Sequence, residues 1–216
     1  MRLRTPWIFT LGAGIYEAIT EQEIWREHCR QMTAHLGGTR VLDLGIGPGV
    51  SGIAMAQAQP GSRYVGMDLS EAMLTRARRK VREAGVTVPL VRADVARLPF
   101  PDGAFDAATA HSFFYLLPDS AAALREVHRV VKPGGRVCFF EPGELPLVPR
   151  VGSVARGFAK NLRFGTSMAL WGIFSGLHGR WTEATLAEAL ARAGFSELRV
   201  AAEMDGLGLL ATARRS

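Results

Sequence analysis

The feature that most constrains this fold is an alternation of strand-like and helix-like segments across the first two thirds of the sequence. Short apolar runs of strand length alternate with segments whose apolar residues recur at helical spacing. The strand-like runs are residues 40–45, 63–68, 86–94, 105–111 and 136–142, and the helix-like segments are residues 50–59, 70–84 and 121–131. Such βαβ units cross over with a right hand, which places the strands parallel in one sheet with helices on both faces. We therefore predict an α/β fold, a three-layer sandwich that binds its ligand at the carboxyl ends of the strands.

The rest of the chain extends this single domain. The sequence after residue 181 has the pattern of a helix opened by an N-cap threonine, followed by two short strands. The expected parts of one domain over residues 1–216 are a leading helical segment 12–36, an insertion 143–180 after the fifth strand, a helix that begins at Thr182, and strands at 197–202 and 208–214. We expect the leading segment to lie across the carboxyl edge of the sheet.

The segment LDLGIGPGVSG follows the first strand and opens a helix. Glycines in such a loop permit positive φ and let a ligand approach the backbone at the helix N-terminus. One frame, residues 47–52, matches the GxGxxG pattern of dinucleotide-binding proteins, and Asp68 follows at the distance of a ribose carboxylate. Asp43 argues against a dinucleotide, because its charge would repel a nearby pyrophosphate. We interpret the segment as a cofactor-binding loop.

Four segments together resemble the class I S-adenosylmethionine-dependent methyltransferases, and among these the type 11 subgroup that includes the ubiquinone and menaquinone C-methyltransferases. The segments are VLDLGIGPG, GMDLSEAML, RADVARLPFPDGAFD and LREVHRVVKPGGRVCFFEP, and the resemblance covers about residues 38–142. It implies a Rossmann-like, seven-stranded, mostly parallel sheet in the order 3-2-1-4-5-7-6 with an antiparallel strand 7. It also implies S-adenosylmethionine as cofactor and S-adenosylhomocysteine as product.

The resemblance also implies cofactor contacts for individual residues. Asp43 would face the ammonium group, Asp68 would accept from two ribose hydroxyls, and Asp94 would accept from the adenine amino group. Taken alone, Asp68 and Asp94 fit turn or cap positions equally well, and Tyr16 fits a core position. The predicted cofactor-binding residues are Tyr16, Asp43, Gly45, Gly47, Gly49, Asp68, Leu69, Asp94, Val95 and His111.

Two side chains at the predicted carboxyl edge are candidates for catalysis. A sulfonium methyl donor is already activated, so orienting the acceptor and excluding water can suffice. His111, which ends the fourth strand, could remove a proton from the acceptor, and Glu141, which ends the fifth, could bind a substrate hydroxyl or ammonium. The alternatives are a pocket-lining or core histidine and a glutamate that caps local structure. No metal site is predicted, because Cys29 and Cys138 lack zinc spacing; we interpret both as buried thiols of a cytoplasmic protein.

Positive charge is concentrated in two segments that contain no acid. The chain carries +6, and residues 145–180 alone contribute +5, while residues 1–16 add two arginines. Apolar residues in the insertion fall on one helical face opposite basic residues, which predicts an amphipathic cationic helix. That face consists of Val151, Val154, Ala155, Phe158, Ala159 and Leu162. Such a helix either packs as a lid over the substrate or lies, with residues 1–16, on an anionic membrane surface.

We therefore expect methyl transfer to a small hydrophobic or lipid-like acceptor. The alternatives are a polar soluble acceptor, an NAD-dependent oxidoreductase that uses the GxGxxG frame, and a cofactor-binding module without turnover. A specific nucleic-acid partner is not expected, because ATAHSFFYLL stands where base-methylating relatives carry a Pro-Pro motif, and basic side chains alone give only nonspecific attraction. The sequence leaves the methylated atom and the oligomeric state open.

Overall fold

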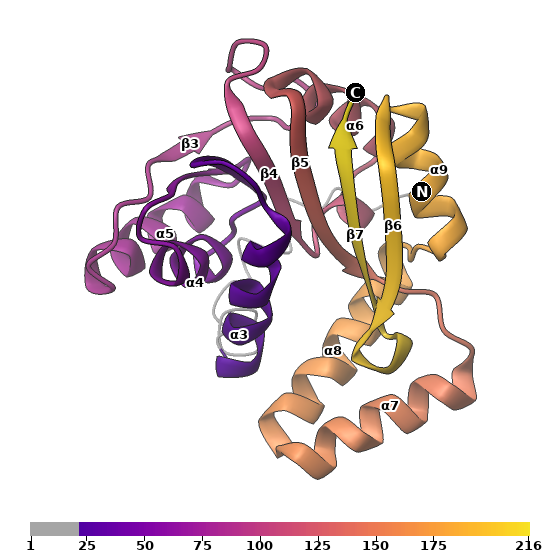
Figure 1. Cartoon of the computed structure of the whole chain (residues 1–216). Helices are drawn as coiled ribbons and strands as arrows, with labels where there is room; N and C mark the ends of the chain where they lie inside the picture. Colours follow the sequence, from indigo (N-terminus) through magenta and orange to yellow (C-terminus); the bar gives the residue numbers. More distant parts are fainter. Residues whose placement is uncertain (1–21) are drawn as a thin grey trace.

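The computed structural model describes residues 22–216, apart from the side chains of residues 147 and 148. Within this range one seven-stranded sheet has the order β3-β2-β1-β4-β5-β7-β6 (Figure 1). Strands β1 to β5 pair in parallel, and β7 runs antiparallel to both β5 and β6. The strands are β1 Arg40–Leu44, β2 Arg63–Asp68, β3 Leu90–Arg92, β4 Phe105–His111, β5 Val131–Pro142, β6 Phe195–Glu203 and β7 Gly208–Arg215. The predicted fold class and strand order are confirmed.

Helices cover both faces of the sheet. Helices α3, α4 and α5 pack on one face and α6 and α9 on the other, while α7 and α8 project beyond the carboxyl edge of the parallel strands (Figure 1). The α-helices are α3 Glu23–Met32, α4 Val50–Ala58, α5 Glu71–Glu83, α6 Ser120–Val130, α7 Leu147–Lys160, α8 Leu162–His178 and α9 Glu183–Arg192. Short 3₁₀ turns are η1 Thr33–His35, η2 Phe114–Leu116 and η3 Met204–Gly206.

The central strands divide their side chains between two cores, as the pleat of a strand requires. In β5, Cys138 and Phe140 join the core beneath α3 and α4, whereas Val137 and Phe139 join the core beneath α6 and α9. Because both faces are covered, these strands read as continuous apolar runs in the sequence. The predicted three-layer sandwich follows from this division.

Two predicted strands differ from the observed ones by more than two residues at one end. The predicted third strand, 86–94, pairs with β2 only over Leu90–Arg92, because Pro89 has no N–H to donate and the chain turns at Asp94. The fifth strand begins at Val131 rather than Arg136. Residues 132–135 form a bulge there, with Gly134 at φ 75°, between two stretches that both pair with β4.

The leading helical segment is shorter than predicted at its carboxyl end, because α3 ends at Met32 and continues only as η1 to His35. Residues 12–21 of the predicted segment, including Tyr16, lie outside the described residues.

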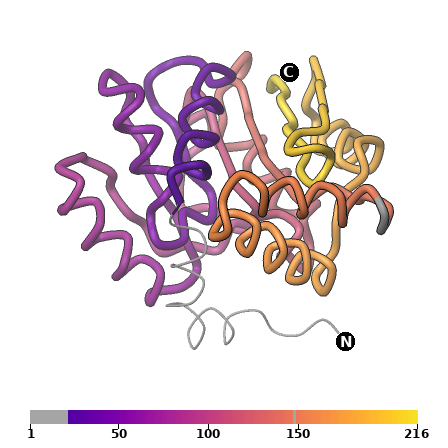
Figure 2. The backbone as a smooth tube through the Cα atoms, turned by 90° about the horizontal axis from the view of Figure 1, so that it is seen from below, coloured from indigo at the N-terminus to yellow at the C-terminus, as the bar shows by residue number. Residues whose placement is uncertain are grey.

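The insertion is a helical hairpin rather than one amphipathic helix. Helix α7 ends at Lys160, and Asn161 is extended, with its side chain accepting hydrogen bonds from the first backbone N–H groups of α8. Leu162 therefore belongs to α8, which corrects the predicted apolar face. The two helices lie side by side (Figure 2) and approach closely because Gly157 faces Met168 and Gly165 faces Phe158.

Among the described residues, none of the helices combines the length and the hydropathy that a membrane-spanning segment requires.

Helix α9 begins with the predicted cap, so we expect Thr182→Ala to lower the free energy of unfolding by about 1 kcal/mol, measured by urea denaturation. The Thr182 hydroxyl accepts from the Thr185 N–H at 3.1 Å, and the Thr185 hydroxyl accepts from the Thr182 N–H at 2.9 Å. Thr166→Ala, in the exposed middle of α8, removes a hydroxyl that serves no helix end and should change stability by less than about 0.5 kcal/mol. Equal effects in the two variants would contradict the role of the cap.

Candidate active site

The loop between β1 and α4 is shaped by three glycines with positive φ: Gly45, Gly47 and Gly49. A Cβ on Gly45 would lie 2.1 Å from the Phe113 ring, so this glycine is required by close packing. A Cβ on Gly49 would lie 3.3 Å from Ala77 of α5, which makes this position a helix-packing contact. A Cβ on Gly47 would meet nothing within 3.8 Å, so the backbone at Gly47 borders open space that a ligand can enter.

Asp68 ends β2 and ties this loop to the sheet. Its carboxylate accepts from the Gly47 N–H at 3.0 Å and from the Ser70 N–H at 2.8 Å, one bond to each oxygen. Each oxygen keeps a further lone pair that can accept from a hydroxyl. Burial raises the pKa of Asp68, although these hydrogen bonds lower it in part. The next residue, Leu69, is 53% exposed and adds an apolar surface beside the carboxylate.

Asp43 is a buried carboxyl group with an unused acceptor. Its Oδ2 accepts from the Ser51 hydroxyl at 2.7 Å, whereas its Oδ1 has no hydrogen-bond partner among the described residues. Burial raises its pKa to about 7, the charge of Asp68 adds to this, and the bonds from Ser51 and the Gly52 backbone oppose it. A buried oxygen without a donor is costly, so Asp43 suits a hydrogen-bonding or cationic ligand.

Asp94 and Val95 follow β3 at the same edge. The Asp94 side chain accepts from the Ala96 N–H at 2.9 Å and is exposed, which is the geometry of an Asx turn. Val95 is buried in the core, so only its backbone can face a ligand. The turn therefore brings the Asp94 side chain and the Val95 backbone to the edge on which Asp68 lies.

Glu141 holds the loop after β4. Its carboxylate is fully buried and accepts from three consecutive backbone N–H groups, those of Phe113, Phe114 and Tyr115, at 2.8 to 3.0 Å. Burial raises its pKa to about 7 in spite of these bonds. With both oxygens engaged and no exposure, Glu141 fits the structural cap that the sequence left as an alternative to a catalytic role.

His111 lies in an aromatic cluster at the ends of β4 and β5. Its ring centroid is 4.9 Å from that of Phe140, 5.6 Å from Trp25 and 5.3 Å from His28. Trp171 of α8 stacks on Phe140 at 5.7 Å. The His111 Nε2 is buried and no described residue pairs with it. Burial, with a further contribution from His28, lowers the pKa of His111 to about 3, so the ring is neutral near pH 7.

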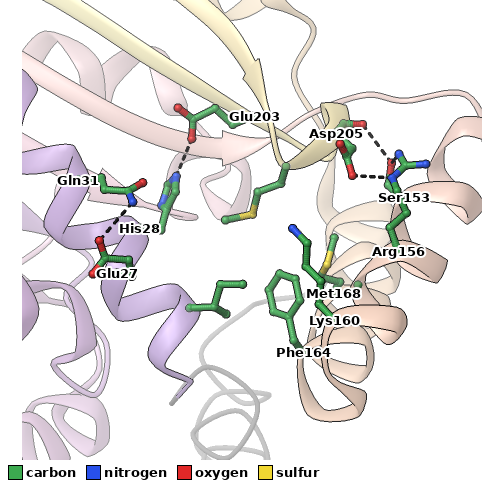
Figure 3. A pocket seen from close by; sticks show the side chains of 13 residues that line it. Glu27, His28, Gln31, Ser153, Arg156, Lys160, Phe164, Met168, Glu203 and Asp205 are labelled. Atoms are coloured by element: carbon green, nitrogen blue, oxygen red, sulfur yellow. Dashed lines mark hydrogen bonds and ion pairs between the residues drawn. The ribbon is translucent and has the colours of Figure 1, made fainter.

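A pocket of about 380 Å³ opens between α3, the α7–α8 hairpin and η3 (Figure 3). Its apolar wall comes from Ile24, Phe164, Met168 and Met204, and its charged rim includes Glu27, Arg156, Lys160 and Asp205. His28 and Glu203 face each other at its inner end, with 2.7 Å between Nε2 and Oε2 (Figure 3). His28, which lines the pocket, also packs on the His111 ring and so joins the pocket wall to the aromatic cluster.

The sequence analysis missed four of these residues: Trp25, His28, Trp171 and Glu203. Trp25 and His28 are three positions apart and therefore share a helix face, a signal that was present in the leading segment. Glu203 gave no such signal, since it is brought to His28 only by the sheet. The predicted carboxyl-edge residues from Asp43 to Glu141 are brought together, and Tyr16 lies outside the described residues.

Comparisons with known proteins place this geometry in a family. A family model described as a methyltransferase domain matches residues 41–135. Demethylmenaquinone methyltransferase of Thermus thermophilus is 39% identical over 117 residues, which are 54% of this chain and 53% of that protein. Demethylmenaquinone methyltransferase of Listeria monocytogenes is 33% identical over 191 residues, which are 84% of this chain and 80% of that protein.

The chain belongs to the class I S-adenosylmethionine-dependent methyltransferases of the menaquinone and ubiquinone methyltransferase-like kind. This confirms the family resemblance seen in the sequence and replaces the dinucleotide interpretation of the GxGxxG frame. Membership implies S-adenosylmethionine as the cofactor, with S-adenosylhomocysteine as its product. The chain spans about half the length of the first curated relatives that it matches.

Solved structures agree on the fold of this methyltransferase domain. The cyclase SpnF superposes with a TM-score of 0.75 at 18% identity and covers 100% of this chain and 96% of its own. A possible histamine N-methyltransferase of Thermotoga maritima gives 0.70 at 20% identity, covering 97% and 99%. Identities this low establish the shared fold alone, which hosts more than one kind of chemistry.

The described residues of the domain fit the cofactor. Asp43 has an unpartnered acceptor that would suit the ammonium end, Gly47 borders open space, and Asp68 keeps two acceptors that would suit ribose hydroxyls. The exposed apolar surface of Leu69 would suit the adenine.

We expect Asp43→Asn to stabilise the cofactor-free domain at pH 8 by about 2 kcal/mol and to weaken cofactor binding. The pKa of Asp43 lies near 7, above its ordinary value of 3.8, so the wild type loses stability as pH rises from about 4 to 7 and the buried carboxyl ionises. The neutral amide avoids this loss. Urea unfolding at pH 5 and pH 8 should therefore show a smaller fall in stability for the variant. If stability falls equally in the variant and the wild type between pH 5 and pH 8, ionisation of Asp43 is not the cause of that fall.

Proposed function

We propose that this chain is an S-adenosylmethionine-dependent methyltransferase that acts on a small hydrophobic acceptor of the hydroquinone type. The observation that carries the proposal is a carboxyl edge where the cofactor-fitting residues Asp43, Gly47 and Asp68 adjoin an aromatic cluster and a pocket. When bound, the cofactor supplies a methyl group on a positively charged sulfur, and the electron pair of the broken S–C bond stays with sulfur.

The proposed cofactor contacts follow the edge of the sheet. Asp43 receives the ammonium end, Gly47 and the neighbouring loop glycines line the methionine part, and Asp68 accepts from the ribose. Asp94, Leu69 and the Val95 backbone surround the adenine. His111, at the end of β4, lies where the acceptor meets the methyl group, and Tyr16 is retained as a cover for the cofactor. Glu141 acts by positioning the loop after β4.

The acceptor class is supported by the pocket. A volume of about 380 Å³ lies in the range of small-molecule sites, and a wall of Ile24, Phe164, Met168 and Met204 suits an apolar ring or chain. Trp25 and Trp171 extend this surface to His111. Matched relatives are named for methyl transfer to demethylmenaquinone, which supports a quinone-type acceptor here. The charged rim with Arg156 and Lys160 is the feature that favours a polar soluble acceptor instead.

We further propose that the α7–α8 hairpin contacts an anionic membrane surface from the cytoplasm. Apolar side chains at helical spacing on α8 are turned outward: Leu162 is 74% exposed, Ile173 64% and Leu177 74%. On α7 the outward residues are Val151 and Phe158, whereas Ser153 and Gly157 are the buried ones. A lid that packed on its own core would bury the apolar side chains. The acid-free segment 145–180 carries the charge that anionic headgroups attract.

The transfer assay uses methyl-labelled cofactor with a reduced short-chain demethylmenaquinone, and in parallel with membranes from a lysate. We expect label in the organic phase.

Asp68→Ala should weaken S-adenosylhomocysteine binding by about 1.5 to 3 kcal/mol, measured by calorimetry, because two hydroxyl contacts are lost. Asp102→Ala, which removes an exposed aspartate at the opposite edge of the sheet, is the matched control. Unchanged affinity in Asp68→Ala would overturn the cofactor assignment. In the transfer assay, label in the aqueous phase would indicate a polar acceptor. Cofactor binding without any methyl transfer would indicate a binding module without turnover.

For the membrane contact, we expect the wild type to sediment with vesicles that contain phosphatidylglycerol. Ile173→Glu with Leu177→Glu should weaken this binding at least ten-fold, because each buried aliphatic side chain contributes about 1.5 to 3 kcal/mol. Ala184→Glu with Ala191→Glu on α9 adds the same charge at exposed positions away from the hairpin and should bind much more tightly than the hairpin variant. Equal binding of the two double variants, or no binding of the wild type, would refute the contact.

A further inference from the structure

His28 is hydrogen-bonded to a carboxylate through one ring nitrogen, and its other ring nitrogen has no partner among residues 22–216. Its side chain is buried, and its Nε2 lies 2.7 Å from the Glu203 carboxylate, to which it donates because an ionised carboxylate only accepts. The hydrogen therefore sits on Nε2, and Nδ1 carries a lone pair. That Nδ1 is buried and has no partner in the described part of the chain.

His111 presents a second unpaired nitrogen beside the first. The two imidazole centroids are 5.3 Å apart, and both rings pack on Phe140, at 4.3 Å for His28 and 4.9 Å for His111. The His111 Nε2 is likewise buried without a partner in that region. With the hydrogen of neutral His111 on Nδ1, both unpaired nitrogens are acceptors, and no described residue donates to either of them. Such a pair suits a ligand that brings its own hydrogen, such as a phenolic hydroxyl.

The two imidazoles differ in how well they can hold a proton. A proton on His28 is stabilised by Glu203, whereas no carboxylate in the described part of the chain forms an ion pair with His111. Burial lowers the pKa of both rings, and Glu203 raises that of His28 against this effect; the pKa of His111 falls to about 3. Of the two, His28 is the better proton acceptor.

We propose that His28 accepts the proton that the acceptor loses on methylation, with Glu203 as its positioning residue and neutral His111 as a hydrogen-bond acceptor for the same hydroxyl. The inference rests on the proposed function. The acceptor forms one bond to the methyl carbon and gives up one proton, which goes to Nδ1 of His28. This assignment moves the base from His111, the candidate in the sequence, to a residue of the leading helix.

Titratable and charged side chains from several elements lie around His28. Glu203 comes from β6 and His111 from β4, Glu27 lies one position before it on α3, and Lys160 of α7 and Asp205 of η3 lie on the rim. Arg156 is engaged by Asp205 at 2.8 Å. Glu203 is the carboxylate in contact with the imidazole, so its removal is the sharpest perturbation.

The test measures kcat and kcat/KM against pH with the reduced short-chain demethylmenaquinone, together with cofactor affinity and nitrogen NMR of the histidines. We expect His28→Gln to lower kcat about 100-fold or more while cofactor affinity changes less than two-fold. Glu203→Gln should move the acidic limb of the pH profile, and the His28 titration seen by NMR, to lower pH. His35→Gln, the same substitution at an exposed position of η1, should leave all of these unchanged.

The possible outcomes separate the two proposals. Activity of His28→Gln within three-fold of the wild type, or an unshifted pH profile in Glu203→Gln, overturns the role of His28 alone. A wild type that binds the cofactor but methylates neither the quinol nor any membrane component overturns the proposed function and this inference with it. If His28→Gln does not fold, the Glu203→Gln pH profile and NMR titration decide.

Discussion

The candidate site depends on the three hydrogen bonds that Glu141 accepts from the backbone after β4. They tie the end of β5 to the chain that leaves β4, directly beyond His111. They also fix Phe113, whose ring closes over Gly45 and so shapes the glycine loop of β1. A single buried carboxylate thus sets the relative positions of the cofactor loop and the aromatic cluster. Parallel strands bring their carboxyl ends to one edge, and Glu141 determines how the loops meet there.

The same edge gathers three carboxyl groups whose ionised form burial disfavours. Burial raises the pKa of Asp43, Asp68 and Glu141, and the charge of Asp68 adds to the shift at Asp43. Retaining an unpaired buried acceptor at Asp43 is unfavourable for folding alone. A cofactor with an ammonium group would give this acceptor the partner that it lacks, so the cost in the empty domain and the proposed affinity for the cofactor would arise from one arrangement.

The sequence predicts the sheet and the position of the glycine loop well, because both rest on local patterns. Residues that are near one another in the sequence determine the strand lengths, the helical spacing of apolar residues and the loop from Gly45 to Gly49. The acceptor half is assembled from distant elements: His28 from α3, Glu203 from β6 and Trp171 from α8. The break at Asn161 was also missed, because apolar spacing continues across it to Leu162 and only the cap geometry ends the helix.

The α7–α8 hairpin has one side that lines the pocket and another side that exposes apolar residues. Its inner side supplies Phe164 and Met168 to the pocket, and its outer side exposes Leu162, Ile173 and Leu177. Gly157 and Gly165 let α7 and α8 pack closely, with the Met168 and Phe158 side chains filling the space over these glycines. One element can therefore rest on a lipid surface while its other face lines the pocket. A hydrophobic acceptor that leaves the bilayer would then meet the apolar pocket wall of Phe164 and Met168 on the same hairpin.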